Sequence, residues 1–472
     1  MNSGLIEADI RRRMAADGVP PLVAEAFLRN VRRWTAGDLG VIPGASLAPI
    51  GPLPRLEELD ELNPAGEAAI ARTVLIKLNG GLGTSMGLDR AKSLIIAKNG
   101  LSFLDVIVRQ VEFLRRRCRA PLPLLLMNSF STEADSLAAL AERHPGFANA
   151  GDLPLSFCQH RVPKLELATG APARWPAQPV LEWCPPGHAD IYHALQTTGL
   201  LDRLLACGFR YAFVSNADNL GALLHMGILA HVAVHRIPFL MEVTARTESD
   251  RKGGHLARSR ETGRLLLRES AQCPAGETAD FQNVEKYDLF NTNNLWLDLE
   301  ALRDMLSACG GLPELPLIVN RKTVDPVRAD SPAVVQLEAA MGSAISCFEN
   351  AAALAVPRFR FAPVKTTNDL LAIRSDLYTL GAEHQVALHP WRFAPPPDIV
   401  LDPRFYKNIA DFELRFAKGA PSLLQCESLK IDGDIHFGAN VRIEGAVHLR
   451  NPTALPAHIA DGTRLHTPVR PV

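Results

Sequence analysis

Residues 73–93 read TVLIKLNGGLGTSMGLDRAKS and join a short apolar run to a loop that is rich in glycine. The run from Thr73 to Leu78 has the length and composition of a buried strand. The loop has four glycines, which let backbone N–H groups approach a ligand, and it closes on the isolated Lys92. A helix start next to the loop would add to the attraction for phosphate. We therefore predict a phosphate-binding loop, and a purely structural turn is the weaker interpretation.

Two familiar phosphate loops fit this stretch poorly. A Walker loop needs Gly-Lys-Ser/Thr, but Lys92 follows an alanine. The dinucleotide fingerprint needs G-x-G-x-x-G, but Gly81, Gly83 and Gly87 have one residue too many. The next apolar run ends in Met127-Asn128, so it lacks the acid that would bind a ribose. An NAD-dependent oxidoreductase is therefore an alternative that the loop itself disfavours.

Strand-like and helical patterns alternate after this loop. Residues 103–117 have helical spacing, residues 131–143 read as a capped helix, and residues 122–127 and 210–214 are short apolar runs. Such alternation is typical of a parallel, doubly wound sheet, in which ligands bind at the carboxyl ends of the strands. We expect an α/β fold with its site at that edge.

The two ends of the chain have different patterns. Residues 21–34 read as a helix and are followed by a stretch rich in proline and glycine over 43–54. We divide the chain into an N-terminal helical segment (1–65), a catalytic domain (66–385) and a C-terminal domain (386–472).

The C-terminal domain contains a six-residue repeat over about 425–470. Large apolar residues form two series, and small residues form a third. These are Ile431, Phe437, Ile443, Leu449 and Leu455; Ile435, Val441 and Val447, resumed at Ile459 and Leu465; and Gly433, Ala439 and Gly445. This pattern favours a short β-helix over a hairpin of alternating strands. The open edge of such a stack suggests a homo-oligomer.

Composition excludes several classes of protein. The net charge of −1 gives no reason to expect nucleic acid as a partner. The eight cysteines are scattered without a C-x-x-C pair, so neither a zinc site nor a disulfide framework is predicted. No signal peptide is recognisable, and the apolar stretch 226–243 is interrupted by histidine, arginine and proline. We expect a soluble, cytoplasmic protein that does not bind a membrane.

The glycine loop and a series of further strings, in the same order, resemble one family. The strings are LMNSF (126–130), PPGH (185–188), VSNADNLG (214–221), MEVT (241–244), KGG (252–254), FNTNNLW (290–296), QLE (336–338), PVKTTNDL (363–370) and FYK (405–407). Together with the repeat region they resemble the eukaryotic-type UTP–glucose-1-phosphate uridylyltransferases. The resemblance implies a Rossmann-like, GT-A-like mixed sheet with helices on both faces and a left-handed C-terminal β-helix. It also implies formation of UDP-glucose and pyrophosphate from UTP and glucose 1-phosphate with Mg²⁺.

The same resemblance implies roles for individual residues. On the nucleotide side, the uridine and its phosphates are expected at Leu78, Asn79, Gly80, Gly81, Gly83, Gln159, Gly187 and His188, with Gln159 reading the uracil edge and His188 over the sugar phosphate. Sugar hydroxyls are expected at Gly254, Glu269 and Asn294, with Asn293 beside them. Lys252 and Lys365 are expected near the phosphates, and Asn219 is a further substrate- or nucleotide-binding residue. Lys92, Lys365 and Asp218 are the implied catalytic residues, and Asp218 is also the implied Mg²⁺ ligand. Residues 88–91 depart from the family pattern, which often ends this stretch in Gly-Pro-Lys.

The implied chemistry suits these residue types. A phosphate oxygen of the sugar 1-phosphate attacks the α-phosphorus of UTP in line, so no general base is required, and catalysis comes from positioning and electrostatics. The sugar could also be galactose or an N-acetylhexosamine. A non-catalytic nucleotide-sugar-binding protein and a hexapeptide-repeat acyltransferase are further alternatives, the latter disfavoured by the few repeats.

Overall fold

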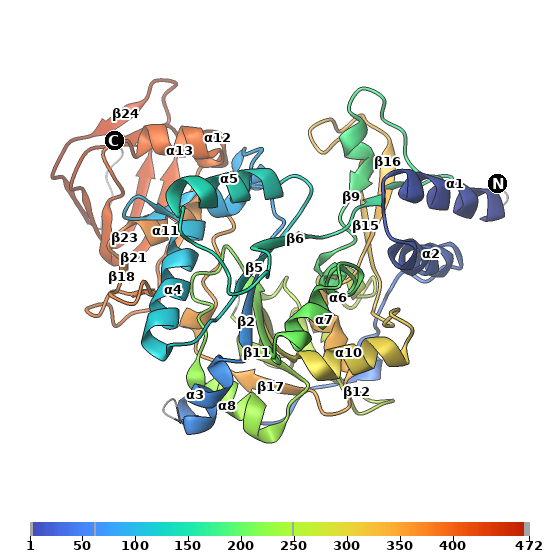
Figure 1. The fold of residues 1–472 in the computed structure, drawn as a ribbon. Coiled ribbons are helices and arrows are strands. Elements are labelled where there is room, and N and C mark those ends of the chain that lie inside the picture. The colour runs from blue at the N-terminus through green and yellow to red at the C-terminus, as the bar shows by residue number, and fades with distance from the viewer. Residues whose placement is uncertain (1–2, 61–62, 248–249, 467–472) are drawn as a thin grey trace.

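A mixed β-sheet forms the centre of the computed structural model, which describes residues 3–60, 63–247 and 250–466 (Figure 1). Its strand order is β1-β12-β14-β10-β2-β5-β6, and β11, β13 and β17 join it through β14, β12 and β11. The bounds are β1 Leu47–Ala48, β2 Thr73–Asn79, β5 Leu124–Asn128, β6 Ser156–Cys158, β10 Tyr211–Asn216, β11 Phe239–Ala245, β12 His255–Ser259, β13 Leu265–Arg268, β14 Leu289–Asp298 and β17 Ala352–Ala355.

The directions of these strands divide the sheet into two parts. Strands β10, β2, β5 and β6 are parallel, as the alternation of strands and helices predicts. Strand β14 is antiparallel to β10, β11 and β12, so a parallel sheet throughout is wrong. A strand's direction depends on how its connection crosses the sheet, which an apolar run in the sequence does not encode. The mixed sheet implied by the family resemblance is confirmed.

Helices cover both faces of the sheet. Successive apolar residues of β2 point to opposite faces, so each face has its own hydrophobic core. Leu75 packs in the core that contains α3, α4 and α8, whereas Val74 and Ile76 pack in the core of α6, α7 and α10. The bounds are α3 Pro64–Ile70, α4 Phe103–Cys118, α5 Glu133–Arg143, α6 Ile191–Thr197, α7 Leu200–Ala206, α8 Met226–His235, α9 Thr278–Phe281, α10 Leu299–Ala308 and α11 Thr367–Arg374. Both faces of the sheet are therefore covered by helices, and the ends of its strands remain available for a binding site.

The N-terminal helices lie at the opposite end of the molecule from the C-terminal strands (Figure 1). Helices α1 (Ser3–Ala16) and α2 (Pro21–Thr35) pack on a small sheet of β15 (Ile318–Thr323), β16 (Ala333–Glu338) and β8 (Leu165–Glu166). Two ion pairs, Arg13 with Glu182 and Arg161 with Asp17, attach them further. The helix predicted at 21–34 is thus confirmed as α2.

The C-terminal strands stack in parallel. The sheet order is β20-β21-β23-β25, and β22 pairs with β24. Leu429 pairs with Val447, 18 residues on, which equals three six-residue repeats. The bounds are β20 Asp398–Leu401, β21 Ser422–Asp432, β22 Ile435–Phe437, β23 Arg442–Arg450, β24 Ala457–Ile459 and β25 Arg464–His466. The prediction that Leu455 belongs to the inward-facing apolar series is wrong, because its side chain is 75% exposed. The turn that contains it is longer than the repeat, since Arg442 pairs with Arg464, 22 residues on.

The C-terminal strands and the elements around the central sheet share one hydrophobic core. Phe412, Leu423 and Leu429 belong to the same buried cluster as Phe103 and Val106 of α4. The remaining elements are β3 Ile96–Lys98, β4 Leu101–Ser102, β7 Val162–Pro163, β9 Trp183–Cys184, β18 Tyr378–Leu380, β19 Val386–Leu388, α12 Pro403–Tyr406 and α13 Ile409–Arg415. Over the residues that the structure describes, no helix combines the length and the apolar character that crossing a membrane requires.

Candidate active site

A cleft of about 330 Å³ opens at the carboxyl ends of β2, β5 and β10. This is the edge where ligands bind in open α/β sheets. Nine residues predicted for the site line it, namely Leu78, Asn79, Gly80, Gly81, Lys92, Gln159, Gly187, His188 and Asp218. The cleft therefore brings together segments that are far apart in the sequence.

The glycine loop folds back on itself at the mouth of this cleft. The backbone N–H of Lys92 donates to the carbonyl of Gly81 at 3.2 Å, which returns the lysine to the start of the loop. Asn79 Nδ2 donates to Asn128 Oδ1 at 2.7 Å and to Ser136 Oγ at 2.8 Å. These bonds connect the ends of β2 and β5 to helix α5. The loop is thus held at both ends while its glycine backbone faces the cleft.

Two glycines of the cleft are required by close neighbours. A Cβ on Gly80 would lie 2.5 Å from Nε2 of Gln159, so a side chain there would displace this amide. Gly187 has φ +88°, and a Cβ on it would lie 2.4 Å from the carbonyl oxygen of Ala339. Gly83 differs, because it is buried against Leu88 inside the loop and does not line the cleft.

Lys92 and Asp218 form an ion pair inside the cleft. Lys92 Nζ lies 2.5 Å from Asp218 Oδ2, and the two side chains are 15% and 20% exposed. Asp218 follows β10, and its carbonyl accepts the N–H of Val364 at 3.1 Å. A phosphate that enters the cleft would compete for the lysine and leave the carboxylate available for a cation.

The donor set at Asp218 fits Mg²⁺ bound together with a phosphate. Among residues 3–60, 63–247 and 250–466, no three His, Cys, Asp or Glu side chains gather as a protein-only metal site. Mg²⁺ is usually held by one or two carboxylates, with substrate phosphates supplying further oxygens. A single carboxylate in a phosphate-sized cleft therefore matches the ligands of this ion.

His188 is a neutral hydrogen-bond donor in this arrangement. It lies in the short helical turn His188–Asp190, and its Nδ1 accepts the backbone N–H of Met341 at 2.9 Å. Since Nδ1 accepts, the ring proton is on Nε2. Burial lowers the pKa of His188 to about 4, so the ring is uncharged at neutral pH.

A second group of predicted residues lies beside the cleft, at the ends of β12 and β13. A Cβ on Gly254 would lie 2.5 Å from Glu269 Oε2, so the two residues are in direct contact. Burial raises the pKa of the Glu269 carboxyl, and the charge of Lys365 partly offsets this rise. Gly254, Glu269 and Lys365 therefore form one cluster. These residues do not line the 330 Å³ cleft.

Asn293 belongs to a bulge in β14. Met241 pairs with Leu295 and Val243 with Asn291, so three residues of β14, Thr292–Asn294, face only Glu242 of β11. Asn293 has φ +57°, and its N–H donates to Asn291 Oδ1 at 2.9 Å. Bulges of this kind redirect side chains and are frequent beside active sites.

Three further predicted residues are placed differently. Asn219 and Asn294 are buried, and both donate to the carbonyl of Arg360, at 3.1 and 3.4 Å. Lys252 is exposed and lies outside the cleft lining. Their roles toward a sugar stay predictions.

The cleft is also lined by five residues that lie in the quoted strings but were given no role. They are Ser93, Met127, Pro185, Asn216 and Ala217. The hydroxyl of Ser93 is buried and has no hydrogen-bond partner among the described residues, which makes it a candidate ligand contact. Its position directly after Lys92 in the sequence is the feature that could have indicated a place in the cleft.

Comparisons with known proteins agree on one family. Residues 48–444 match the family described as UTP–glucose-1-phosphate uridylyltransferase. The enzyme of that name from Solanum tuberosum is 40% identical over 443 residues, covering 92% of this chain and 90% of the relative. The one from Hordeum vulgare is 40% identical over 433 residues, covering 91% and 86%.

Solved structures give the same result. A mutant UDP-glucose pyrophosphorylase from Leishmania major in complex with UDP-Glc superposes with a TM-score of 0.93 at 41% identity, covering 99% of both chains. UDP-glucose phosphorylase from Trypanosoma brucei gives a TM-score of 0.91 at 42% identity, again covering 99% of both. The chain therefore belongs to the UTP–glucose-1-phosphate uridylyltransferase family.

Proposed function

We propose that this chain transfers the uridylyl group of UTP to glucose 1-phosphate and releases UDP-glucose and pyrophosphate. A phosphate oxygen of the sugar phosphate bonds to the α-phosphorus, and the bond between that phosphorus and the bridging oxygen breaks. The bond electrons leave with pyrophosphate, so atoms and charge balance without a covalent enzyme intermediate. The observation that carries the proposal is the glycine-lined cleft with Lys92 and Asp218 paired inside it.

The nucleotide is proposed to lie along the glycine loop. The backbone of Leu78–Gly81 and Gly83 supports the uridine and phosphates, and Gly187 leaves room for the base. Gln159 would read the uracil edge, since its amide lies directly over Gly80. His188 would donate from Nε2 to a phosphate oxygen, because its Nδ1 is already used by Met341.

The charges around the reacting phosphates explain how the reaction is accelerated. Lys92 and Lys365 are proposed to offset the negative charge that accumulates on the leaving group. Asp218 would hold Mg²⁺, which, when bound, neutralises and orients phosphate oxygens. No side chain has to remove a proton, because the attacking oxygen is already anionic.

The sugar is proposed to lie toward the second group of residues. Gly254, Glu269, Asn293 and Asn294, with Asn219 behind them, are assigned to its hydroxyls, and Lys252 is assigned to the phosphates. The contact between Gly254 and Glu269 supports this assignment because it places an acceptor next to a bare backbone. Glucose is the proposed sugar on the strength of the relatives' names.

We also infer three properties outside the site. The C-terminal strands form a left-handed β-helix, the chain assembles into a homo-oligomer through this domain, and the protein is cytoplasmic. The parallel stacking of β21, β23 and β25 supports the first of these. Sedimentation of the intact chain tests the second, since a mass of one chain would contradict it.

Pyrophosphate release tests the main proposal. Purified protein is assayed with UTP, Mg²⁺ and, in turn, the 1-phosphates of glucose, galactose and N-acetylglucosamine. We expect the fastest release with glucose 1-phosphate and none when the metal is chelated. Faster release with another sugar would keep the reaction and overturn the substrate. The absence of release with all three would favour a nucleotide-sugar-binding protein.

A further inference from the structure

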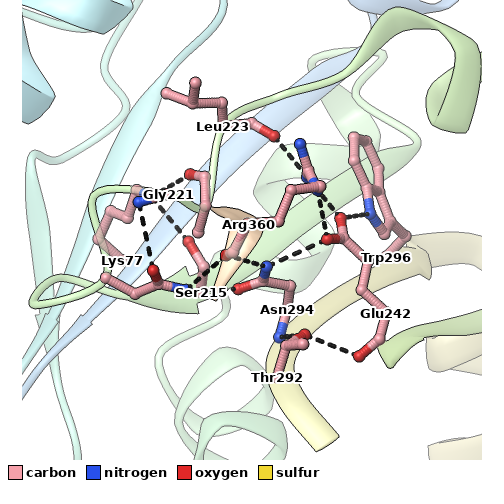
Figure 2. Close-up of polar contacts among 11 residues, drawn as sticks. Lys77, Ser215, Gly221, Leu223, Glu242, Thr292, Asn294, Trp296 and Arg360 are labelled. Carbon is pink, nitrogen blue, oxygen red and sulfur yellow. Dashed lines mark hydrogen bonds and ion pairs between the residues drawn. The ribbon is translucent and has the colours of Figure 1, made fainter. Parts of the chain in front are cut away.

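A buried ionic network joins strands β11 and β14 to Arg360 (Figure 2). Glu242 of β11 accepts two hydrogen bonds from Arg360, from Nε and Nη2, both at 2.7 Å. It accepts two more, from Trp296 Nε1 at 2.9 Å and from Asn294 Nδ2 at 3.1 Å. The side chains of Glu242 and Arg360 are 0% and 3% exposed. A carboxylate so deeply buried is tolerated because four donors and one full charge compensate it.

Glu242 holds the bulge of β14 from both sides. It is the single residue of β11 that faces Thr292–Asn294. Its backbone carbonyl accepts the Thr292 hydroxyl at 2.7 Å, while its carboxylate accepts the Asn294 amide (Figure 2). Asn293 lies between these two anchors with its left-handed φ. The position of Asn293 therefore depends on Glu242.

Arg360 extends the network to the phosphate side of the site. Its carbonyl accepts Asn219 Nδ2 at 3.1 Å, and Asn219 Oδ1 accepts the N–H of Ala362 at 3.0 Å. The adjoining Asp218 carbonyl accepts the N–H of Val364 at 3.1 Å. The segment 360–364 is thus fixed against the turn that carries Asp218, and Lys365 follows it directly.

We propose that Glu242 is a positioning residue of the uridylyl transfer. Through the bulge it sets the position of Asn293, and through Arg360 it supports the backbone of segment 360–364; it contacts no substrate itself. This inference rests on the proposed function. Among the residues that the structure describes, Gly80, Gly81 and Gln159 form no hydrogen bond with the members of this network, so loss of Glu242 should affect the sugar side selectively.

Kinetics of Glu242→Gln test the proposal. Gln has the same size, but its amide presents N–H to donors that need an acceptor. We expect the KM for glucose 1-phosphate to rise about tenfold and kcat to fall about tenfold, since small misplacements of reacting groups are costly. The Kd for UTP, measured by calorimetry, should change less than about twofold. A UTP affinity that falls as much as the sugar affinity would overturn the proposal.

Double-mutant cycles separate positioning from a general loss of stability. If Glu242 acts through Asn293, the effects of Glu242→Gln and Asn293→Ala on kcat/KM should not multiply. The effects of Glu242→Gln and Gln159→Ala should multiply, because those residues act on different substrates. Multiplying effects in the first cycle would show that Glu242 supports only the fold.

Asp434→Asn is the matched control for a disrupted ion pair. Asp434 pairs with Arg415 at 2.8 Å in the C-terminal region, away from the site. It should lower the unfolding midpoint and leave all kinetic constants unchanged.

A milder variant covers the case in which Glu242→Gln does not fold. Thr292→Val removes the bond to the Glu242 carbonyl, and with it the weaker bond that the hydroxyl accepts from the Asn294 N–H at 3.3 Å. It should raise the KM for glucose 1-phosphate about threefold, with unchanged UTP affinity. The proposal would be overturned if the KM for glucose 1-phosphate did not change in this variant, or if the UTP affinity fell as well. Wild-type protein that releases no pyrophosphate would instead overturn the proposed function, so the two failures are distinguishable.

Discussion

The two sides of the proposed site differ in the atoms that form them, which are mainly backbone on one side and mainly side chain on the other. The side proposed for the nucleotide is mostly backbone, with Gly80, Gly81 and Gly187 exposing main-chain atoms to the cleft. On the sugar side, the Asn293 bulge is held by side chains that are bonded to the Glu242–Arg360 pair. A substitution on the nucleotide side therefore acts by local steric contact. We expect a substitution on the proposed sugar side to affect more distant groups, because its side chains are bonded to one another through the Glu242–Arg360 pair.

Lys92→Met tests the point where the two sides meet. The variant removes the charge that pairs with Asp218, so kcat/KM should fall for both substrates by about 10²–10³. The steady-state rates with UTP and glucose 1-phosphate measure this effect. Lys418→Met is the control, since Lys418 is an exposed lysine paired with Asp461 in the C-terminal region. Equal rates for wild type and Lys92→Met would remove the lysine from the mechanism.

The pKa of Lys77 tests whether the charges of the Glu242–Arg360 pair influence a side chain of β2, the strand that leads into the glycine loop. Lys77 lies in β2, fully buried, and donates to Ser215 Oγ at 2.7 Å and to the Ala222 carbonyl at 3.0 Å (Figure 2). Burial, and then the charge of Arg360, lower its pKa to about 7, while Glu242 acts in the opposite direction.

The sign of the resulting pH effect follows from proton binding. Between pH 7 and the ordinary lysine pKa of about 10.4, the unfolded chain binds the proton more tightly than the folded protein does, so stability rises with pH. The free energy of unfolding of wild type, relative to Lys77→Met, should increase by about 2 kcal/mol from pH 7 to pH 9. Urea unfolding of both proteins at the two pH values measures it. A constant difference would show that Lys77 keeps an ordinary pKa.

Gly80→Ala tests whether a substitution in the glycine loop affects the binding of UTP alone. The new methyl group would meet the Gln159 amide, so the KM for UTP should rise about tenfold while the KM for glucose 1-phosphate is unchanged. Gly146→Ala is the matched control, because a Cβ there meets no atom within 4 Å. A rise in both KM values would mean that the two sides are coupled through the loop.

The smallest effect is expected for the ionisation of His188. Its pKa of about 4 keeps the ring neutral, so kcat/KM should show no inflection from this residue between about pH 5.5 and 8. The pH profile of the wild type measures this. An inflection near pH 6.5 that disappears in His188→Asn would contradict a buried, neutral ring.

Local patterns in the sequence predicted much of the cleft lining at the glycine loop. The strand and the glycine loop are continuous in sequence, so Leu78–Gly81 and Lys92 could be recognised directly. Gln159, Gly187 and Asp218 were found through the family resemblance, and the structure brings them to the same cleft.

The network behind the sugar side could not be predicted in this way. Glu242 and Arg360 are 118 residues apart, and neither stands in a pattern that indicates its partner. The antiparallel direction of β14 and the exposed position of Leu455 were missed for a related reason. Both depend on how connections run in space, which residue spacing alone does not specify.

The longer turn of the C-terminal repeat marks a place where the chain tolerates extra length. Residues 452–456 are exposed, and the corner is closed from within by Asn451, whose amide donates to the carbonyls of Asp434 and Leu455. The strand pairs that span this turn, β22 with β24 and β23 with β25, keep a constant register despite the four additional residues. Lengthening an exposed loop costs little free energy. A peptide tag or a fluorescent label inserted at Ala454 would therefore report on the protein while the strands around it stay paired.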